Sequence, residues 1–390
     1  MLWTFWISVA FVAYSMVGYA GCLWVLSLVR RKIVRRAPME PMISILIVVR
    51  GGANVIEEKL CNCLEQNYSR KKMEIVVVCD GPAPETEAIV EKYSAQGVRL
   101  MRCDRQGKSA CLAHALGATS GEIVVFTDAG VTMDSDSLCR MAENFSDPRV
   151  GCVSSEDATR PNGGNAEPMY ISFDSWLRRR EGEVCTLIGA SGALFAARRS
   201  VCSRWPERLS SDFHLPLRAI EDGLITVVDT RVAAHLSAVR MEDEFERKVR
   251  TIVHGIDVLV EFAHLLNPFR YGLVAWELAS HKLFRWLLPL AFLTALISNI
   301  YLYQVRSFYR VTLLLQIGLL ATGGVGIAAP RLARLLPFKV ASFLLIGNMA
   351  TIQAWLLYLS GERYVMWEPS KRREPASESV KEGCERYADR

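Results

Sequence analysis

Four long uncharged segments constrain this chain more than any other feature. The first covers residues 2–29, and the others cover residues 286–305, 311–330 and 340–361. Each reaches the roughly 20 residues that an apolar helix needs to cross a bilayer. The segment between the first and second has ordinary mixed composition and is long enough for an enzyme-sized domain. We therefore expect a multi-pass membrane protein whose folded domain lies between membrane-spanning ends.

The charges beside the first segment indicate its orientation. A signal peptide, the alternative interpretation, carries positive charge before a shorter apolar run. Here the basic residues follow the run: Arg30, Arg31, Lys32, Arg35 and Arg36. The positive-inside rule then places the middle domain in the cytoplasm, at the inner (plasma) membrane. Three further spans would put the tail outside, whereas its basic residues 371–373 favour the inside, so the side of the tail stays open.

Apolar runs alternate with helical stretches from Ile43 onward. The pattern predicts strands at residues 43–49, 73–79, 98–101 and 123–127, and helices at residues 55–65, 85–96 and 108–118. Such alternation is typical of an α/β domain whose parallel sheet has helices on both faces. Ligands of these sheets bind at the carboxyl ends of the strands. Asp80 and Asp128 stand at two of those ends.

The stretch VVFTDAG, residues 124–130, ends a buried strand in a carboxylate followed by two small residues. A buried carboxylate costs free energy unless something pairs with it. A cation held beside a ligand would pair with Asp128, and the small residues would leave room for that ligand. An ordinary turn is the alternative, because Asp and Gly are common turn residues.

Three later features also have two interpretations each. Residues 189–193, GASGA, are small enough for the backbone to approach a ligand, and tight helix packing explains them equally well. Asp212 precedes a helical stretch at residues 213–220, so it is either a functional carboxylate or a helix cap. Residues 242–266 predict an amphipathic helix, either at the membrane interface or packed within the soluble domain.

The ordered set of motifs resembles the membrane-bound family 2 glycosyltransferases over most of residues 40–370. EIVVVCDGP (74–82) resembles the strand that ends in the family's base-contacting Asp. GK with SACLAHALGATSGEIVVFTDAG (107–130) resembles its GKxxALNxGxxxAxGExxxFxDAD segment. Further matches, to FxDPxVGxVxG, GxxGxxxxxRR, EDxxLxxRxxxxG and QxxRW, are NFSDPRVGCVS (144–154), GASGALFAARR (189–199), SSDFHLPLRAIEDG (210–223) and the FERKVR stretch (245–250).

This resemblance implies a GT-A fold, with a mixed or parallel sheet, and an inverting active site. By position, Asp80 would contact the base or ribose, Asp128 would ligate Mg²⁺ or Mn²⁺, and Asp212 would be the general base. The remaining implied contacts are Lys108 and Arg250 to the donor, and Gly189, Ser191 and Gly192 on the acceptor side. The residue types suit the chemistry. A diphosphate leaving group needs cationic stabilisation, hard cations take oxygen ligands, and the acceptor hydroxyl needs a base.

Several positions depart from the family pattern. Gly130 replaces the second carboxylate of DxD, and residues 51–53, GGA, replace an N-E-E triplet. Ser191 and Ser211 stand where relatives have acidic residues. At the QxxRW motif, Arg247 and Thr251 stand in place of Gln and Trp. Water and phosphate could fill the gap at some loss of affinity. An acidic side chain from elsewhere, such as Asp104, Asp134 or Glu156, would complete the metal site and would favour the enzyme over a scaffold.

These observations lead to two functional hypotheses. We expect an inverting hexosyltransferase that moves single sugars from a nucleotide sugar, UDP-linked, to a lipid-linked or growing glycan at the cytoplasmic membrane face, in envelope or exopolysaccharide synthesis. The departures motivate the alternative, a catalytically impaired scaffold subunit of a polysaccharide-synthesis complex. Expected partners are the donor, the acceptor, membrane lipids and other envelope-polysaccharide proteins. No nucleic acid is expected, because the sequence has no motif for it.

The expected domain organisation follows the chain. It comprises a membrane helix with its basic flank (1–36), the GT-A domain (37–240), interfacial helices (241–284), about three further membrane helices (285–362) and a charged, disordered tail (363–390).

Overall fold

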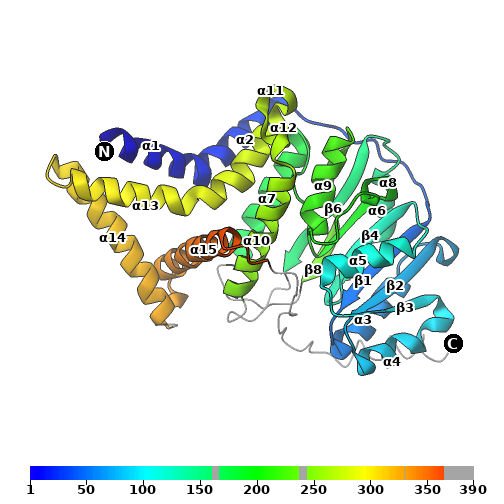
Figure 1. Cartoon of the computed structure of the whole chain (residues 1–390). Helices are drawn as coiled ribbons and strands as arrows, with labels where there is room; N and C mark the ends of the chain where they lie inside the picture. The colour runs from blue at the N-terminus through cyan, green and yellow to red at the C-terminus, as the bar shows by residue number, and fades with distance from the viewer. Residues whose placement is uncertain (160–166, 237–243, 330, 364–390) are drawn as a thin grey trace. The chain divides into compact units, whose positions relative to one another are not determined.

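The computed structural model describes residues 1–159, 167–236, 244–329 and 331–363 (Figure 1). The chain forms two compact units. An α/β unit contains residues 31–159 and 181–236. A helical unit contains residues 1–30, the long helix α7 (Glu167–Val184) up to residue 180, and the chain from α10 (Glu244–Glu261) to residue 363. Each unit is described by itself below.

One mixed sheet of eight strands, in the order β3-β2-β1-β4-β7-β6-β8-β5, organises the α/β unit. Its parallel half, from β3 to β4, is the part that the sequence predicts, while β7 and β5 run antiparallel to their neighbours. The strands are β1 (Ile43–Val49), β2 (Met73–Asp80), β3 (Val98–Cys103), β4 (Ile123–Asp128), β5 (Val131–Met133), β6 (Val150–Thr159), β7 (Leu194–Arg198) and β8 (Ile225–Leu236).

Side chains alternate between two cores along β1, because successive residues of a strand point to opposite faces. Ile45 and Ile47 belong to one buried cluster, which α3 (Ala53–Leu64), α4 (Pro84–Lys92) and α6 (Ser137–Asn144) complete. Leu46 and Val48 belong to the other, which α5 (Lys108–Gly117), α8 (Arg199–Cys202) and α9 (Ser211–Glu221) complete. The expected GT-A type architecture, with helices on both faces of a mixed sheet, is confirmed.

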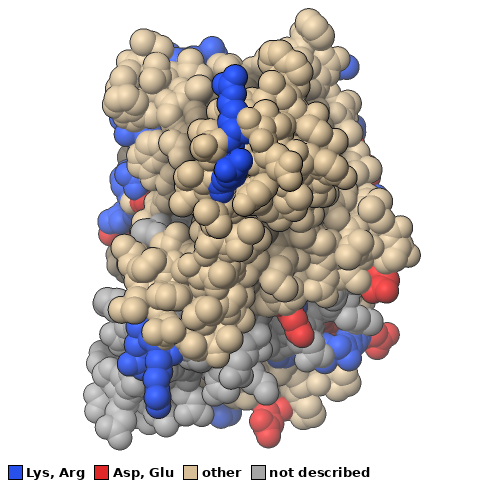
Figure 2. Space-filling view, turned by 90° about the vertical axis from the view of Figure 1, so that its left-hand side faces the viewer, with Lys and Arg blue, Asp and Glu red and all other residues tan. Residues whose placement is uncertain are grey.

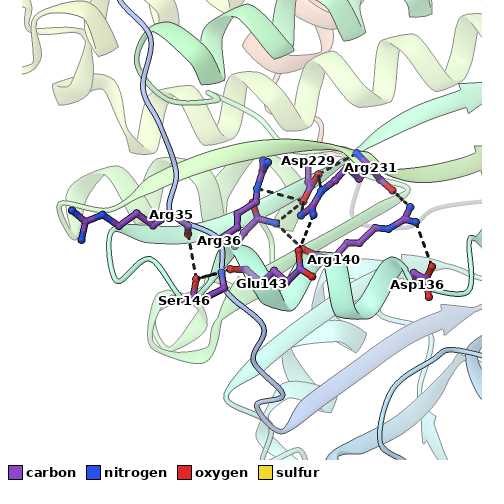
Figure 3. A network of polar contacts seen from close by, with 10 residues as sticks. Arg35, Arg36, Asp136, Arg140, Glu143, Ser146, Asp229 and Arg231 are labelled. Atoms are coloured by element: carbon purple, nitrogen blue, oxygen red, sulfur yellow. Dashed lines mark hydrogen bonds and ion pairs between the residues drawn. The ribbon is translucent and has the colours of Figure 1, made fainter.

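The basic segment after the first apolar helix is bonded to the α/β unit (Figure 3). Arg36 donates to Asn144 at 2.8 Å and lies 3.8 Å from the buried Asp229. Asp229 also binds Arg231 at 2.7 Å. Burial alone would raise the pKa of Asp229, but its bonds to Arg231 and Asn144 and the charge of Arg36 lower it. Arg36 thus pairs with a buried carboxylate of the folded unit. The orientation that the positive-inside rule predicts therefore depends on the other basic residues of this segment.

Four helical stretches of the helical unit are long and apolar enough to cross a membrane: Leu2–Val29, Leu273–Leu302, Ser307–Ala328 and Leu336–Leu359. They comprise α1 (Leu2–Ala13) with α2 (Tyr19–Val29), α12 (Leu273–Leu278) with α13 (Phe284–Leu302), α14 and α15. Large apolar side chains such as Trp3, Leu314 and Leu356 are exposed on them. Figure 2 shows that the surface over these helices is largely uncharged on the side it presents.

The second of these stretches begins earlier than the sequence predicts. Charged residues at 277, 282 and 285 interrupt the apolar run, but the helix continues through them by a wide turn at Ala279–Leu283. The apolar face of the amphipathic α10 packs against α15, where Val249 and Val253 meet Ala350 and Ala354. Thus part of the segment expected to be interfacial belongs to a candidate span, and α10 packs on another.

Candidate active site

Two aspartates end the strands on either side of β1. β2 pairs with one edge of β1 and β4 with the other, and in this register Asp128 is opposite Val48. The chain leaves β1 through Gly51 and Gly52, both in the left-handed region, and enters α3. A side chain at Gly52 would also meet Val49 at 2.9 Å. The glycines that replace N-E-E therefore form a tight turn between the two strand ends.

Asp80 is almost completely buried, with 2% of its surface exposed. Its Oδ1 accepts hydrogen bonds from the backbone amides of Gln106 at 2.9 Å and Gly107 at 3.1 Å. The Cys111 thiol lies 3.5 Å away; burial first, and then the charge of Asp80, raise the pKa of this thiol, so it stays a donor. Among the described residues, Oδ2 has no hydrogen-bond partner. This buried oxygen is suited to accept a hydrogen bond from a ligand N–H or O–H.

Asp128 stands in a different environment, with 32% of its side chain exposed. The Lys108 amine lies 2.6 Å from Asp128 Oδ1 and 3.5 Å from the Gly192 carbonyl. Lys108 begins α5, and the residue before it supplies the amide that binds Asp80. The Gly107–Lys108 pair therefore joins the two strand ends, with its backbone on one carboxylate and its side chain on the other.

The small residues at 189–193 lie between Asp128 and Asp212. The Asp128 amide donates to Ala193 O at 3.1 Å, and the Ala190 amide donates to Asp212 O at 2.8 Å. A Cβ at Gly192 would lie 3.1 Å from Asp212 Oδ2, so only glycine leaves this carboxylate an open neighbour. Gly189 begins the same loop, and its role on the acceptor side stays a prediction.

Asp212 is not the N-cap of its helix. The cap of α9 is Ser210, and Asp212 lies one residue inside, in the first turn. Its partly buried side chain faces Gly192. A carboxylate near a helix N-terminus is favoured by the helix dipole. Asp212 is therefore not the cap residue, and its role as general base stays a prediction.

Ser191 recruits an acidic residue that the sequence did not single out. Its hydroxyl donates to Asp157, on β6, and its backbone amide donates to Ser154 Oγ at 2.8 Å. Ser191 stands where relatives have an Asp, so the structure brings a carboxylate to this position from another strand. The sequence could not show this, because the two residues lie 34 apart and meet only through the fold.

Arg250 lies on α10, in the helical unit, so its contact with the donor diphosphate stays a prediction. The metal site has only one clear protein ligand. No group of three or more His, Cys, Asp or Glu residues able to hold a metal occurs in the described parts of the chain, and Asp134 pairs with His235 at 2.9 Å. Among the described residues, Asp128 offers a carboxylate oxygen of the kind that Mg²⁺ and Mn²⁺ prefer. One carboxylate fits a cation that would take further oxygen ligands from a bound diphosphate.

Residues 44–205 match the model for glycosyl transferase family 2. The beta-monoglucosyldiacylglycerol synthase of Trichormus variabilis is 25% identical over 188 residues, which are 44% of this chain and 39% of that protein. Glycosyltransferase AglE of Haloferax volcanii is 29% identical over 137 residues, 34% of this chain and 45% of that one. The chain thus matches less than half the length of these curated relatives.

A solved structure extends the likeness beyond the matched domain. The mannosyltransferase PcManGT from Pyrobaculum calidifontis, in complex with GDP-Man and Mn²⁺, superposes with a TM-score of 0.72 at 23% identity, covering 92% of this chain and 100% of that chain. At this identity the likeness shows the fold. The match of residues 44–205 and the curated relatives support a family 2 glycosyltransferase, and the structural likeness shows the GT-A fold.

Proposed function

We propose that the protein transfers a hexose from a nucleotide sugar to an acceptor hydroxyl, with inversion at the anomeric carbon. The observation that carries this proposal is the continuity of the site. Lys108 contacts Asp128 and approaches Gly192, the side of Gly192 that a Cβ would occupy faces the Asp212 carboxylate, and Gly107 holds Asp80. Four residues expected to act on donor and acceptor, Asp80, Lys108, Asp128 and Asp212, thus form one connected group.

Each side chain has a distinct task in this proposal. Asp80 Oδ2 accepts a hydrogen bond from the base or ribose of the donor. Lys108 would bind the donor diphosphate in place of Asp128, and Asp128 would offer its carboxylate to Mg²⁺ or Mn²⁺. That cation, when bound, neutralises charge that builds on the leaving group. Asp212 takes the proton of the acceptor hydroxyl, because a direct displacement needs one base.

The acceptor and location extend the proposal. One relative is named for the synthesis of a glucosyldiacylglycerol, a lipid product, and this chain has four helices long enough to cross a membrane. Both support a lipid-linked or growing glycan acceptor at the cytoplasmic face of the inner membrane, in envelope polysaccharide synthesis. We expect UDP as the nucleotide; the bound donor GDP-Man of PcManGT makes GDP sugars the first alternative in a screen.

One observation favours a second candidate, the catalytically impaired scaffold subunit. Asp128 is the single carboxylate at the end of β4, and its Oδ1 is engaged by Lys108. If no cation binds there, the leaving group would lack its main stabilisation. A scaffold would still bind partner proteins but would not turn over any donor.

The general base provides the test. Purified protein in nanodiscs is supplied with UDP and GDP hexoses and with extracted membrane lipids, and sugar transfer is followed by mass spectrometry. Replacing Asp212 with Asn should lower kcat at least 100-fold, within the range for a lost general base, and should leave donor binding unchanged. Asp222→Asn, at the other end of α9 and paired with Arg218 at 3.0 Å, is the matched control. Unchanged transfer by Asp212→Asn would refute the base, and wild-type protein inactive with every donor would favour the scaffold.

A further inference from the structure

We propose that a polar stripe, formed by Lys59 and Asn62 on α3 and by Gln66 just after its end, holds the Asp128 turn in place and that Lys59 is a positioning residue for the diphosphate site. The inference rests on the proposed function. Lys59 and Asn62 are three residues apart, so they share one face of the helix. That face lies under the segment that follows β4.

Lys59 ties together the two sides of the turn. Although 1% of it is exposed, its amine donates to Thr127 Oγ1 at 2.9 Å and to the Val131 carbonyl at 2.7 Å. Thr127 precedes Asp128, and Val131 follows Gly130. The Lys59 side chain therefore bonds both ends of the turn that carries Asp128. Burying an amine costs free energy that an apolar side chain would avoid. Packing alone therefore does not explain a lysine at this position.

The other two members extend the support along the chain. Asn62 donates to the Met133 carbonyl at 2.8 Å and accepts from the Met133 amide at 3.0 Å. Gln66 donates to the Asp134 carbonyl at 3.0 Å and accepts from the Leu138 amide at 3.3 Å. Thus the three side chains of the stripe bond the backbone of residues 131, 133, 134 and 138.

This support matters because the turn after β4 has one carboxylate, Asp128, that could hold a cation. Where two carboxylates chelate a cation, the cation itself helps to fix their turn. Here Gly130 carries no carboxylate, so the position of Asp128 depends on the protein beneath it. Small displacements of groups that bind a reacting ligand lower rates steeply, by about 100-fold for 1 Å. The stripe supplies the rigidity that the missing ligand does not.

The test measures UDP binding by calorimetry, with and without Mn²⁺, in the full-length protein. Lys59→Met should weaken Mn²⁺-dependent binding at least 10-fold while changing metal-free binding less than 2-fold, because Asp80 is held by other groups. Thr127→Val, which removes one acceptor of the amine and keeps the shape of the side chain, should act in the same direction with a smaller effect. Tyr68→Phe is the matched control: it deletes a buried hydrogen bond to Pro41 O, 2.6 Å long, without touching the turn.

The outcomes separate this inference from the function beneath it. If both variants lower the melting temperature but keep wild-type Mn²⁺ dependence, Lys59 is only structural and the inference is wrong. If Tyr68→Phe weakens Mn²⁺-dependent binding as much as Lys59→Met, general destabilisation explains the effect and the inference again fails. If the wild type binds neither UDP nor GDP with Mn²⁺, the proposed function fails, and the inference with it.

Discussion

The two strand-end aspartates look alike in sequence and differ in the folded protein. Asp80 is buried and fixed by two backbone amides, and one of its oxygens has no hydrogen-bond partner among the residues that the structure describes. Asp128 is about one-third exposed and engages the amine of Lys108. Backbone amides cannot move away, whereas a lysine side chain can. We therefore expect Asp80 to make a constant hydrogen bond and Asp128 to exchange partners when the donor binds.

Replacing Lys108, the movable partner of Asp128, should have the largest effect on the rate of transfer. Lys108→Met should lower kcat/KM for transfer about 100-fold, the scale for losing one donor that stabilises transition-state charge, while Lys108→Arg should retain much of the rate. Steady-state kinetics with the active donor measure both variants. Lys72→Met, which removes a half-exposed lysine elsewhere in the α/β unit, should be unchanged. A Lys108→Met rate within 2-fold of wild type would contradict the exchange.

Changing the fixed carboxylate should have a smaller and different effect. Asp80→Asn should weaken UDP binding about 10-fold, as expected for a hydrogen bond to a charged group, because the amide presents a weaker acceptor. The dependence of binding on Mn²⁺ should stay as in the wild type. Calorimetric titrations at several Mn²⁺ concentrations separate the two quantities, with Asp222→Asn, at the C-terminal end of α9, as control. A changed Mn²⁺ dependence in Asp80→Asn would show that the two strand ends are not distinct.

The smallest expected effect is tighter Mn²⁺ binding when a second carboxylate is added near Asp128. Gly130 is not among the described glycines with positive φ, so its backbone permits a side chain. Gly130→Asp adds a carboxylate two residues after Asp128 and should lower the Mn²⁺ concentration for half-maximal UDP binding a few-fold, because charge count raises the affinity for a hard cation. Gly130→Asn is the uncharged control. Equal effects of Asp and Asn would mean that charge at this position does not reach the cation.

The sequence predicted the parallel half of the sheet well and the antiparallel half poorly. Strands β1, β2 and β4 are nearly continuous apolar runs because both of their faces are buried. β6 and β8 contain serine, threonine and acidic residues, and β5 has only three residues, so no strand pattern stands out. These segments become strands because they pair with other strands in the folded protein, and the local sequence does not reveal that pairing.

The candidate site divides in a similar way. Asp80, Lys108, Asp128 and Asp212 were identified because each occupies a motif position, and the structure brings them together. Asp157 and Lys59 were missed because nothing local distinguishes them. Asp157 matters through its bond to Ser191, and Lys59 resembles any charged residue of a helix until the fold shows that it is buried. Arg250 lies in the other unit, so its role stays a prediction.

Calorimetric titration of UDP into the purified protein, with and without Mn²⁺, tests the central claim most directly when wild type and Asp128→Ala are compared. We predict that Mn²⁺ strengthens binding to the wild type and has no effect on Asp128→Ala, which should retain the metal-free affinity that Asp80 provides. Equal Mn²⁺ enhancement in both proteins would show that Asp128 does not hold the cation and would contradict the account.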